Sequence, residues 1–156
     1  MAAVPSTHPL ATQATVTADA LKNETMLLLG NGHCFRDHVL EVCPEFARFS
    51  SNAEGIQKSF EGSSLETIKH MVAAGMGVTL VPRLSVPKEA LSTQVKRKKS
   101  EETYVRYLPI EDEAGGAPPT RRVVLAWRRS FTRYEAIAAL RNAIYACELP
   151  GVNRLS

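Results

Sequence analysis

Two cysteines, Cys34 and Cys43, are the residues whose type and spacing point most directly to chemistry. Cys34 falls at the start of an expected helix, where unpaired backbone N–H groups and the positive end of the helix dipole favour a thiolate. A thiolate attacks one peroxide oxygen while a nearby donor stabilises the departing hydroxide, and a second thiol condenses with the resulting sulfenic acid. His33 and Arg36 are close enough in sequence to supply that donor. Cys43 is the obvious second thiol.

The spacing of the two cysteines also restricts how they can react. Nine residues of continuous helix rise by roughly 13 to 14 Å and rotate by about 900°, which sends the two side chains to opposite faces. A disulfide needs Cα atoms about 4.4 to 6.8 Å apart. The bond therefore cannot form while the helix is intact, and we expect oxidation to remodel this segment and so change its shape.

Other interpretations of these residues stay open. Cys34 and Cys43 could both be buried core thiols of an ordinary helix, and Cys147 is expected to be a packing or surface residue. A zinc site is disfavoured because no CxxC or HxxxH spacing occurs among His33, Cys34, His38, His70 and Asp37. Acyl transfer by the neighbours His33 and Cys34 is disfavoured because sequence neighbours rarely align imidazole and sulfur.

A second set of polar residues, Ser63 and Ser64, precedes an apolar periodic stretch. The segment 63–66 has the sequence of a capping box, so these hydroxyls are expected to cap a helix. They are also candidates for binding a small polar ligand at the same helix end.

Composition limits the class of protein without defining it. The 156 residues are 44% hydrophobic and 22% charged, which is ordinary for a soluble globular chain. No run is long and apolar enough to span a bilayer, and the first residues lack the features of a signal peptide, so we expect a cytoplasmic protein. The net charge of +3 comes partly from basic runs that are usually solvated surfaces. Three cysteines argue against a secreted disulfide framework.

The order of apolar runs, helical periodicities and glycines predicts alternating strands and helices. The first 25 residues are interpreted as an extended or loop entry with a helical turn at 16–21. Residues 46–52 are ambiguous, and 88–102 are a surface connection. Expected strands lie at 26–29, 56–60, 78–81, 104–110 and 122–127, and expected helices at 33–43, 65–74 and 134–145. This alternation predicts a parallel α/β sheet with right-handed crossovers.

Two sequence stretches carry a resemblance to a known family. GHCFRDHVLEVC at 32–43, followed by SSLETIKHMVAAGMGVTLVP at 63–82, resembles the OxyR-type hydrogen peroxide sensors among the LysR-type transcriptional regulators. The histidine, cysteine, Arg-Asp and second cysteine form the specific part of the pattern, and the second stretch is more generally LysR-like. The resemblance extends from about His8 through the last helix, nearly the whole chain.

The resemblance implies roles for these residues. Cys34 would be the peroxidatic cysteine and Cys43 the resolving cysteine, with His33, Arg36 and Asp37 supporting them. It implies a periplasmic-binding-protein-like LysR regulatory domain with no cofactor or metal, which acts on oxidative-stress genes as an activator and is not an enzyme. Expected partners are hydrogen peroxide, further copies of the chain in dimers and tetramers, a thiol reductant such as a glutaredoxin system, and DNA through a head domain; no membrane is expected.

The resemblance also predicts how the chain is divided. Residues 1–25 would form an entry segment and hinge, 26–110 regulatory subdomain II with the cysteine pair, and 111–156 the hinge return with the last strand and helix of subdomain I. The family's helix-turn-helix domain and the first part of subdomain I have no counterpart in these residues. The strand at 123–127 and the helix at 134–145 would then expose an apolar face, and we expect the chain to associate or to pack poorly there.

Two further functions are left open by the residues alone. One is a thiol peroxidase that uses Cys34 and Cys43 for turnover. The other is a lobe that binds a small-molecule effector, in which the cysteines are incidental. Sustained peroxide consumption with a reductant would favour the enzyme, and absence of oxidation would favour the effector-binding lobe.

Overall fold

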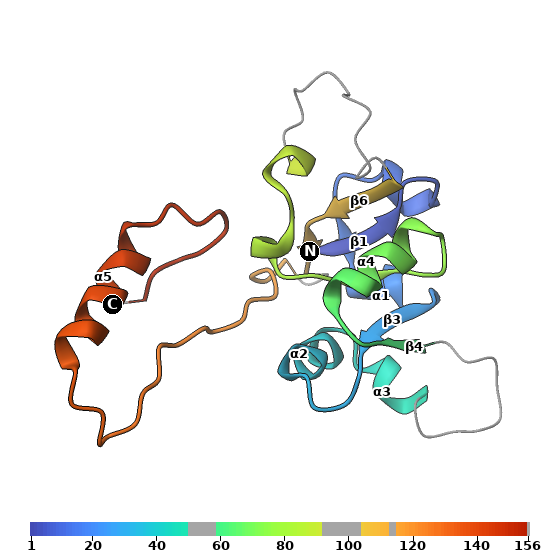
Figure 1. Cartoon of the computed structure of the whole chain (residues 1–156). Helices are drawn as coiled ribbons and strands as arrows, with labels where there is room; N and C mark the ends of the chain where they lie inside the picture. The colour runs from blue at the N-terminus through green and yellow to red at the C-terminus, as the bar shows by residue number, and fades with distance from the viewer. Residues whose placement is uncertain (50–58, 92–103, 113–114, 156) are drawn as a thin grey trace. The chain divides into compact units, whose positions relative to one another are not determined.

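The fold was determined from a computed structural model that describes residues 1–49, 59–91, 104–112 and 115–155. The chain divides into two units, Met1–Pro119 and Thr120–Ser156, which are described separately (Figure 1). The predicted residues 50–52, 56–58 and 92–103 lie outside the described part. Among the described residues, no helix is long and apolar enough to cross a membrane.

The first unit contains short strands and helices that alternate along the chain. Its strands are β1 (Ala2–Pro5), β2 (Val16–Thr17), β3 (Met26–Leu29), β4 (Ser59–Gly62), β5 (Thr79–Leu80), β6 (Val105–Leu108) and β7 (Ile110–Glu111). Its helices are α1 (Ala18–Leu21), α2 (Cys34–Val42), α3 (Glu45–Phe49) and α4 (Leu65–Ala73), with 3-10 turns η1 (Pro9–Thr12), η2 (Arg83–Ser85) and η3 (Lys88–Leu91).

The strands form a mixed arrangement. Strands β3 and β4 pair in parallel, Met26 opposite Ser59, and a parallel bridge joins Met26 to Val78. Strand β2 pairs in parallel with β7. In contrast, β1 lies between β5 and β6 and is antiparallel to both. The predicted parallel sheet is thus correct around β3 but wrong for β1, because residues 1–25 were not expected to contain strands.

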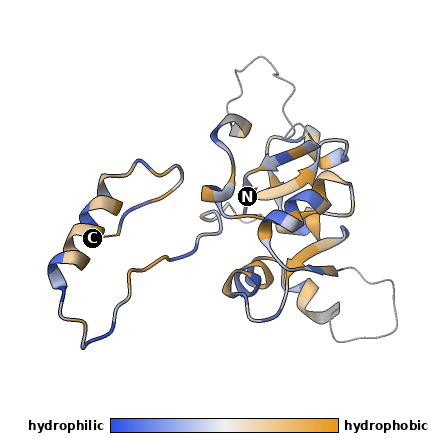
Figure 2. Cartoon of the chain, viewed as in Figure 1, coloured by the Kyte–Doolittle hydropathy of each residue, from blue (hydrophilic) through white to orange (hydrophobic). Residues whose placement is uncertain are grey.

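Strand β3 is buried on both faces, as its continuous apolar run predicts. Its alternate residues enter two apolar clusters, and Figure 2 shows hydrophobic residues concentrated on the strands of this unit. The first cluster contains Met26 and Leu28 with Val39, Cys43 and Phe46. The second contains Leu27 and Leu29 with Ile68 and Val72. Helices α2 and α3 therefore pack against one face of β3, and α4 packs against the other.

The N-terminal residues correct the predicted loop. Ala2, Ala3 and Val4 are fully buried in β1, although this stretch is too short to show periodicity. The predicted helical turn at 16–21 is a strand followed by a helix, because the Thr17 side chain accepts a hydrogen bond from the Ala20 backbone N–H at 3.2 Å and so starts α1 at Ala18.

Two other predicted strands differ in the structure. The stretch 104–110 forms two strands, β6 and β7, which belong to different sheets and are separated by Pro109. Proline has no N–H to donate to a ladder, and the Pro109 carbonyl accepts from Val16 N–H at 3.0 Å. Residues 122–127 belong to no strand among the residues that the structure describes.

The described residues of the second unit contain one helix, α5 (Tyr134–Ala146), close to the predicted 134–145. The segment before it and the helix expose large apolar side chains, among them Val123, Val124, Trp127, Tyr134 and Tyr145. The predicted exposed apolar face is therefore present in this unit. Association through it stays a prediction.

Gly77 is expected to be intolerant of a side chain. A Cβ at Gly77 would press against the Thr25 backbone carbonyl oxygen, which is fixed because it accepts the Val78 N–H at 2.9 Å. Gly77→Ala should therefore lower the free energy of unfolding by about 1 to 3 kcal/mol in urea titrations followed by circular dichroism. Gly30→Ala is the matched control, because a Cβ there first meets Glu61 Oε2 at 3.9 Å, an ordinary contact. Equal unfolding midpoints for the two variants would contradict this packing argument.

Candidate functional site

Cys34 is the first residue of α2 and is exposed to solvent. Gly32, in a left-handed conformation with φ of 92°, turns the chain after β3, and His33 follows as the N-cap in an extended conformation. The His33 side chain makes no capping hydrogen bond, so the first turn of α2 has no side-chain cap there. The thiol therefore lies at a helix N-terminus, where unpaired N–H groups and the dipole favour an anion.

Cys43 lies at the opposite end of the same helix and is fully buried. Its backbone N–H donates to the Val39 carbonyl at 2.9 Å and its side chain belongs to the apolar cluster that contains Phe46. Burial raises the pKa of the Cys43 thiol to about 12, and the neighbouring Glu45 carboxylate adds to the rise. Cys43 is thus held as a neutral thiol while Cys34 is the accessible one, and the interpretation of both as buried core thiols is wrong for Cys34.

The two thiols are free and are separated by the unbroken helix α2. The predicted helix 33–43 is confirmed to within a residue at each end. A rise of about 1.5 Å per residue places the two ends well beyond the Cα separation of a disulfide. Bond formation from this conformation would require α2 to unwind.

Arg36 joins α2 to the neighbouring strands. Its side chain is 7% exposed, and Nη1 donates to the Leu29 carbonyl at 2.8 Å and to Glu61 Oε1 at 2.7 Å. These bonds reach the end of β3 and the middle of β4. The guanidinium is therefore engaged with the sheet rather than with the thiol, and its visible role is to hold α2 in position. Asp37, in the first turn of α2, is exposed.

Ser64 caps helix α4. Its Oγ accepts from the Thr67 N–H at 3.1 Å and lies 2.9 Å from Thr67 Oγ1, while Ser63 is exposed. The predicted capping box from Ser63 to Glu66 is wrong by one residue, because the cap reaches Thr67. Glu66 pairs instead with Lys69, at 2.9 Å. No ligand role for either serine is visible in this arrangement.

Two residues near the cysteines were not assigned a role from sequence. Glu61 lies beside Arg36 only because β3 and β4 pair in parallel, and a single sequence does not reveal that pairing. His38 was weighed only as a metal ligand, yet its Nδ1 is buried and has no hydrogen-bond partner within the described part of the chain. Its spacing of one helical turn from Cys34 is the signal that could have identified it. Among the described residues, no group of three His, Cys, Asp or Glu side chains is placed to hold a metal ion.

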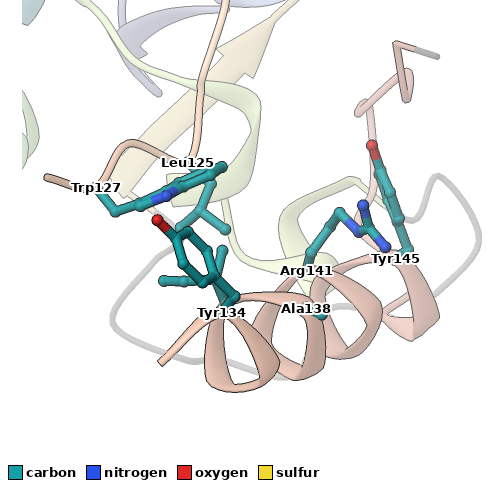
Figure 3. Close-up of a pocket in the computed structure, with 7 residues that line it drawn as sticks. Leu125, Trp127, Tyr134, Ala138, Arg141 and Tyr145 are labelled. Carbon is teal, nitrogen blue, oxygen red and sulfur yellow. The ribbon is translucent and has the colours of Figure 1, made fainter. Parts of the chain in front are cut away.

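The second unit contains a shallow hollow of about 340 Å³. In Figure 3, the rings of Trp127 and Tyr134 lie near each other at one end, and Arg141 and Tyr145 lie together at the other. The lining is mainly apolar and carries no cysteine, whereas Cys34 and Cys43 both lie in the first unit. Cys147 follows α5, is exposed, and its thiol lies 3.2 Å from the Ala143 carbonyl that accepts its hydrogen bond.

The chain is similar to proteins of a known family. The family described as the LysR substrate binding domain matches residues 1–146. The chain is 36% identical over 134 residues to the hydrogen peroxide-inducible genes activator of Pectobacterium carotovorum, with 84% of the chain and 38% of that relative covered. It is 37% identical over 135 residues to the DNA-binding transcriptional dual regulator OxyR of Escherichia coli, with coverages of 84% and 37%. The chain thus spans less than two fifths of the length of these relatives.

Solved structures show the same relationship. The reduced form of OxyR from N. meningitidis superposes with a TM-score of 0.78 at 34% identity, over 99% of this chain and 64% of that one. The reduced OxyR regulatory domain from Pseudomonas aeruginosa gives 0.66 at 35% identity, over 94% and 60%. The chain belongs to the LysR substrate-binding domain family and has the mixed α/β fold of the OxyR regulatory domains.

Proposed function

We propose that this chain is the hydrogen peroxide-sensing regulatory part of an OxyR-like LysR-type transcription regulator, switched by a reversible disulfide between Cys34 and Cys43. The observation that carries the proposal is that a single helix presents an exposed thiol at its N-terminus and a buried thiol at its C-terminus. Relatives named as hydrogen peroxide-inducible genes activators support the assignment.

The proposed chemistry needs one molecule of peroxide for each switch. The Cys34 sulfur attacks a peroxide oxygen, the O–O bond breaks, and the products are a sulfenic acid and water. The Cys43 thiol then attacks the sulfenic sulfur, which forms the disulfide and releases a second water. Two thiol hydrogens are lost in total, and the peroxide is reduced. A thiol reductant, such as a glutaredoxin system, would reduce the disulfide and regenerate both thiols.

The switch follows from the position of Cys43. A buried neutral thiol at the far end of α2 attacks only after the helix opens and Cys43 leaves its apolar cluster. Opening the segment also breaks the bonds that Arg36 makes to Leu29 and Glu61, because Arg36 lies between the two cysteines. Oxidation would thereby change the packing of α2 on the sheet.

The effect of this switch on transcription would depend on the other parts of the regulator. We assign residues 26–110 to regulatory subdomain II and residues 111–156 to the hinge return and the last strand and helix of subdomain I. Self-association and contact with DNA through a head domain are proposed by analogy with the relatives, which are named as transcription regulators rather than enzymes. A disulfide that forms and is reduced again suits a reducing compartment, so the cytoplasm remains the expected location.

Peroxide titration with peptide mass spectrometry tests the two roles. The wild-type chain should lose two hydrogens for each peroxide and yield a cross-linked peptide pair that contains Cys34 and Cys43. Cys34→Ser should abolish the reaction, because the attacking sulfur is removed. Cys43→Ser should leave a sulfenic acid at Cys34 that dimedone traps.

The control for this experiment is Cys147→Ser, which should still form the bond between Cys34 and Cys43 because the proposed switch does not use Cys147. Normal oxidation of Cys43 in the Cys34→Ser variant would show that the assigned roles are wrong. Sustained peroxide consumption in the presence of a reductant would instead support a thiol peroxidase.

Weakening the Arg36 anchor should speed the second step. Glu61→Gln removes the negative charge that faces the Arg36 guanidinium. Because Glu61 is partly exposed, this loss should destabilise the helical form by about 1 kcal/mol. The rate at which the sulfenic acid becomes the disulfide should rise about fivefold in quenched-flow mass spectrometry. Glu66→Gln, which removes an exposed carboxylate on α4, is the control. A slower or unchanged second step in Glu61→Gln would argue against an opening of α2.

Alkylation should distinguish the three thiols before any oxidation. At about pH 8, iodoacetamide should modify the exposed Cys34 and Cys147 first and Cys43 last, because burial raises the pKa of Cys43 to about 12 and keeps it protonated. Unfolding in urea should raise the alkylation rate of Cys43 to that of Cys34 and Cys147. Early labelling of Cys43 in the native chain would contradict its position in the apolar cluster.

A further inference from the structure

His38 lies one helical turn after Cys34 on α2. Side chains four residues apart on a helix are neighbours, with Cβ atoms roughly 5 to 6 Å apart. Helical side chains also lean toward the N-terminus, so each covers the turn before its own Cα. From this geometry we expect the imidazole of His38 to lie toward the turn that carries the exposed Cys34 thiol.

The imidazole has an unused hydrogen-bonding atom. His38 Nδ1 is buried and has no partner in the described part of the chain, whereas most buried polar atoms of proteins are paired. The atom is a donor or an acceptor depending on the tautomer. Because Cys34 lies one helical turn earlier on the same side of α2, its thiol is a candidate partner for this atom.

We propose that His38 is the proton-transfer residue for oxidation of Cys34. This role rests on the proposed function, in which hydrogen peroxide is the oxidant. It accounts for the transfer of each proton in the reaction. His38 accepts the thiol proton, the sulfur forms a bond to one peroxide oxygen as the O–O bond breaks, and His38 returns the proton to the departing hydroxide. Sulfur loses two electrons, the products are a sulfenic acid and water, and His38 ends neutral.

The other polar residues around Cys34 fit this role less well. Arg36 is bonded to Leu29 and Glu61 and cannot accept a proton. His33 precedes the helix in an extended conformation and is exposed, so its ring is not held by the helix. An imidazole both accepts and donates a proton near neutral pH, which a carboxylate such as Asp37 does less readily.

The test compares two reactions of Cys34 in a chain that carries Cys43→Ser and Cys147→Ser, so that one thiol remains. Hydrogen peroxide has a leaving group that needs a proton, whereas iodoacetamide releases iodide, which needs none. His38→Gln keeps a polar side chain of similar size but cannot carry a proton. It should slow the peroxide reaction by roughly tenfold or more, and slow alkylation by a clearly smaller factor. His70→Gln, an exposed histidine on α4, should change neither rate.

The outcomes separate the inference from the function on which it rests. A peroxide rate in His38→Gln equal to that of the parent, or an equal loss in both reactions, overturns the role of His38 and leaves Cys34 as the sensor. Failure of the parent to oxidise Cys34 overturns the proposed function itself. His38→Ala with added imidazole provides a second test, since free imidazole should restore the peroxide rate, and no restoration would count against proton transfer.

Discussion

The guanidinium of Arg36, buried between a helix and two strands, fixes the position of the helix that carries both cysteines. Its bonds to the Leu29 carbonyl and the Glu61 carboxylate join α2 to the end of β3 and the middle of β4. A buried cation requires such partners, because leaving it unpaired costs more than the pair contributes. The same bonds that stabilise α2 therefore resist any rearrangement of the segment between Cys34 and Cys43.

The different environments of the two thiols follow from the way α2 packs. Val39 and Cys43 face the apolar cluster under the helix, while Cys34 and Asp37 face solvent. One helix thus places one sulfur in water and the other in a medium that disfavours its charged form. The proposed order of reaction would then follow from burial. The distance along α2 makes a disulfide between the two cysteines incompatible with the resting fold.

The sequence predicts best those features that depend on local pattern. The apolar run at Met26–Leu29 and the helical periodicities of α2, α4 and α5 are sufficient to locate these elements. The cysteines are candidates for a site because their chemistry is rare. The pair of Arg36 and Glu61 was not predictable, since it depends on parallel pairing between strands far apart in sequence. Strand β1 was missed because its burial comes from β5 and β6 on either side, not from a pattern of its own.

The second unit shows why helices and strands differ in what a sequence can predict. Helix α5 forms where it is expected because its backbone hydrogen bonds are internal to the segment. Residues 122–127 have an equally apolar pattern, yet a strand exists only when a neighbour supplies the other half of each hydrogen bond. The exposed side chains of Val123, Val124 and Trp127 are those of a strand that has not been paired. Pattern alone predicts that this segment is to be buried, and only a pairing partner can make it a strand.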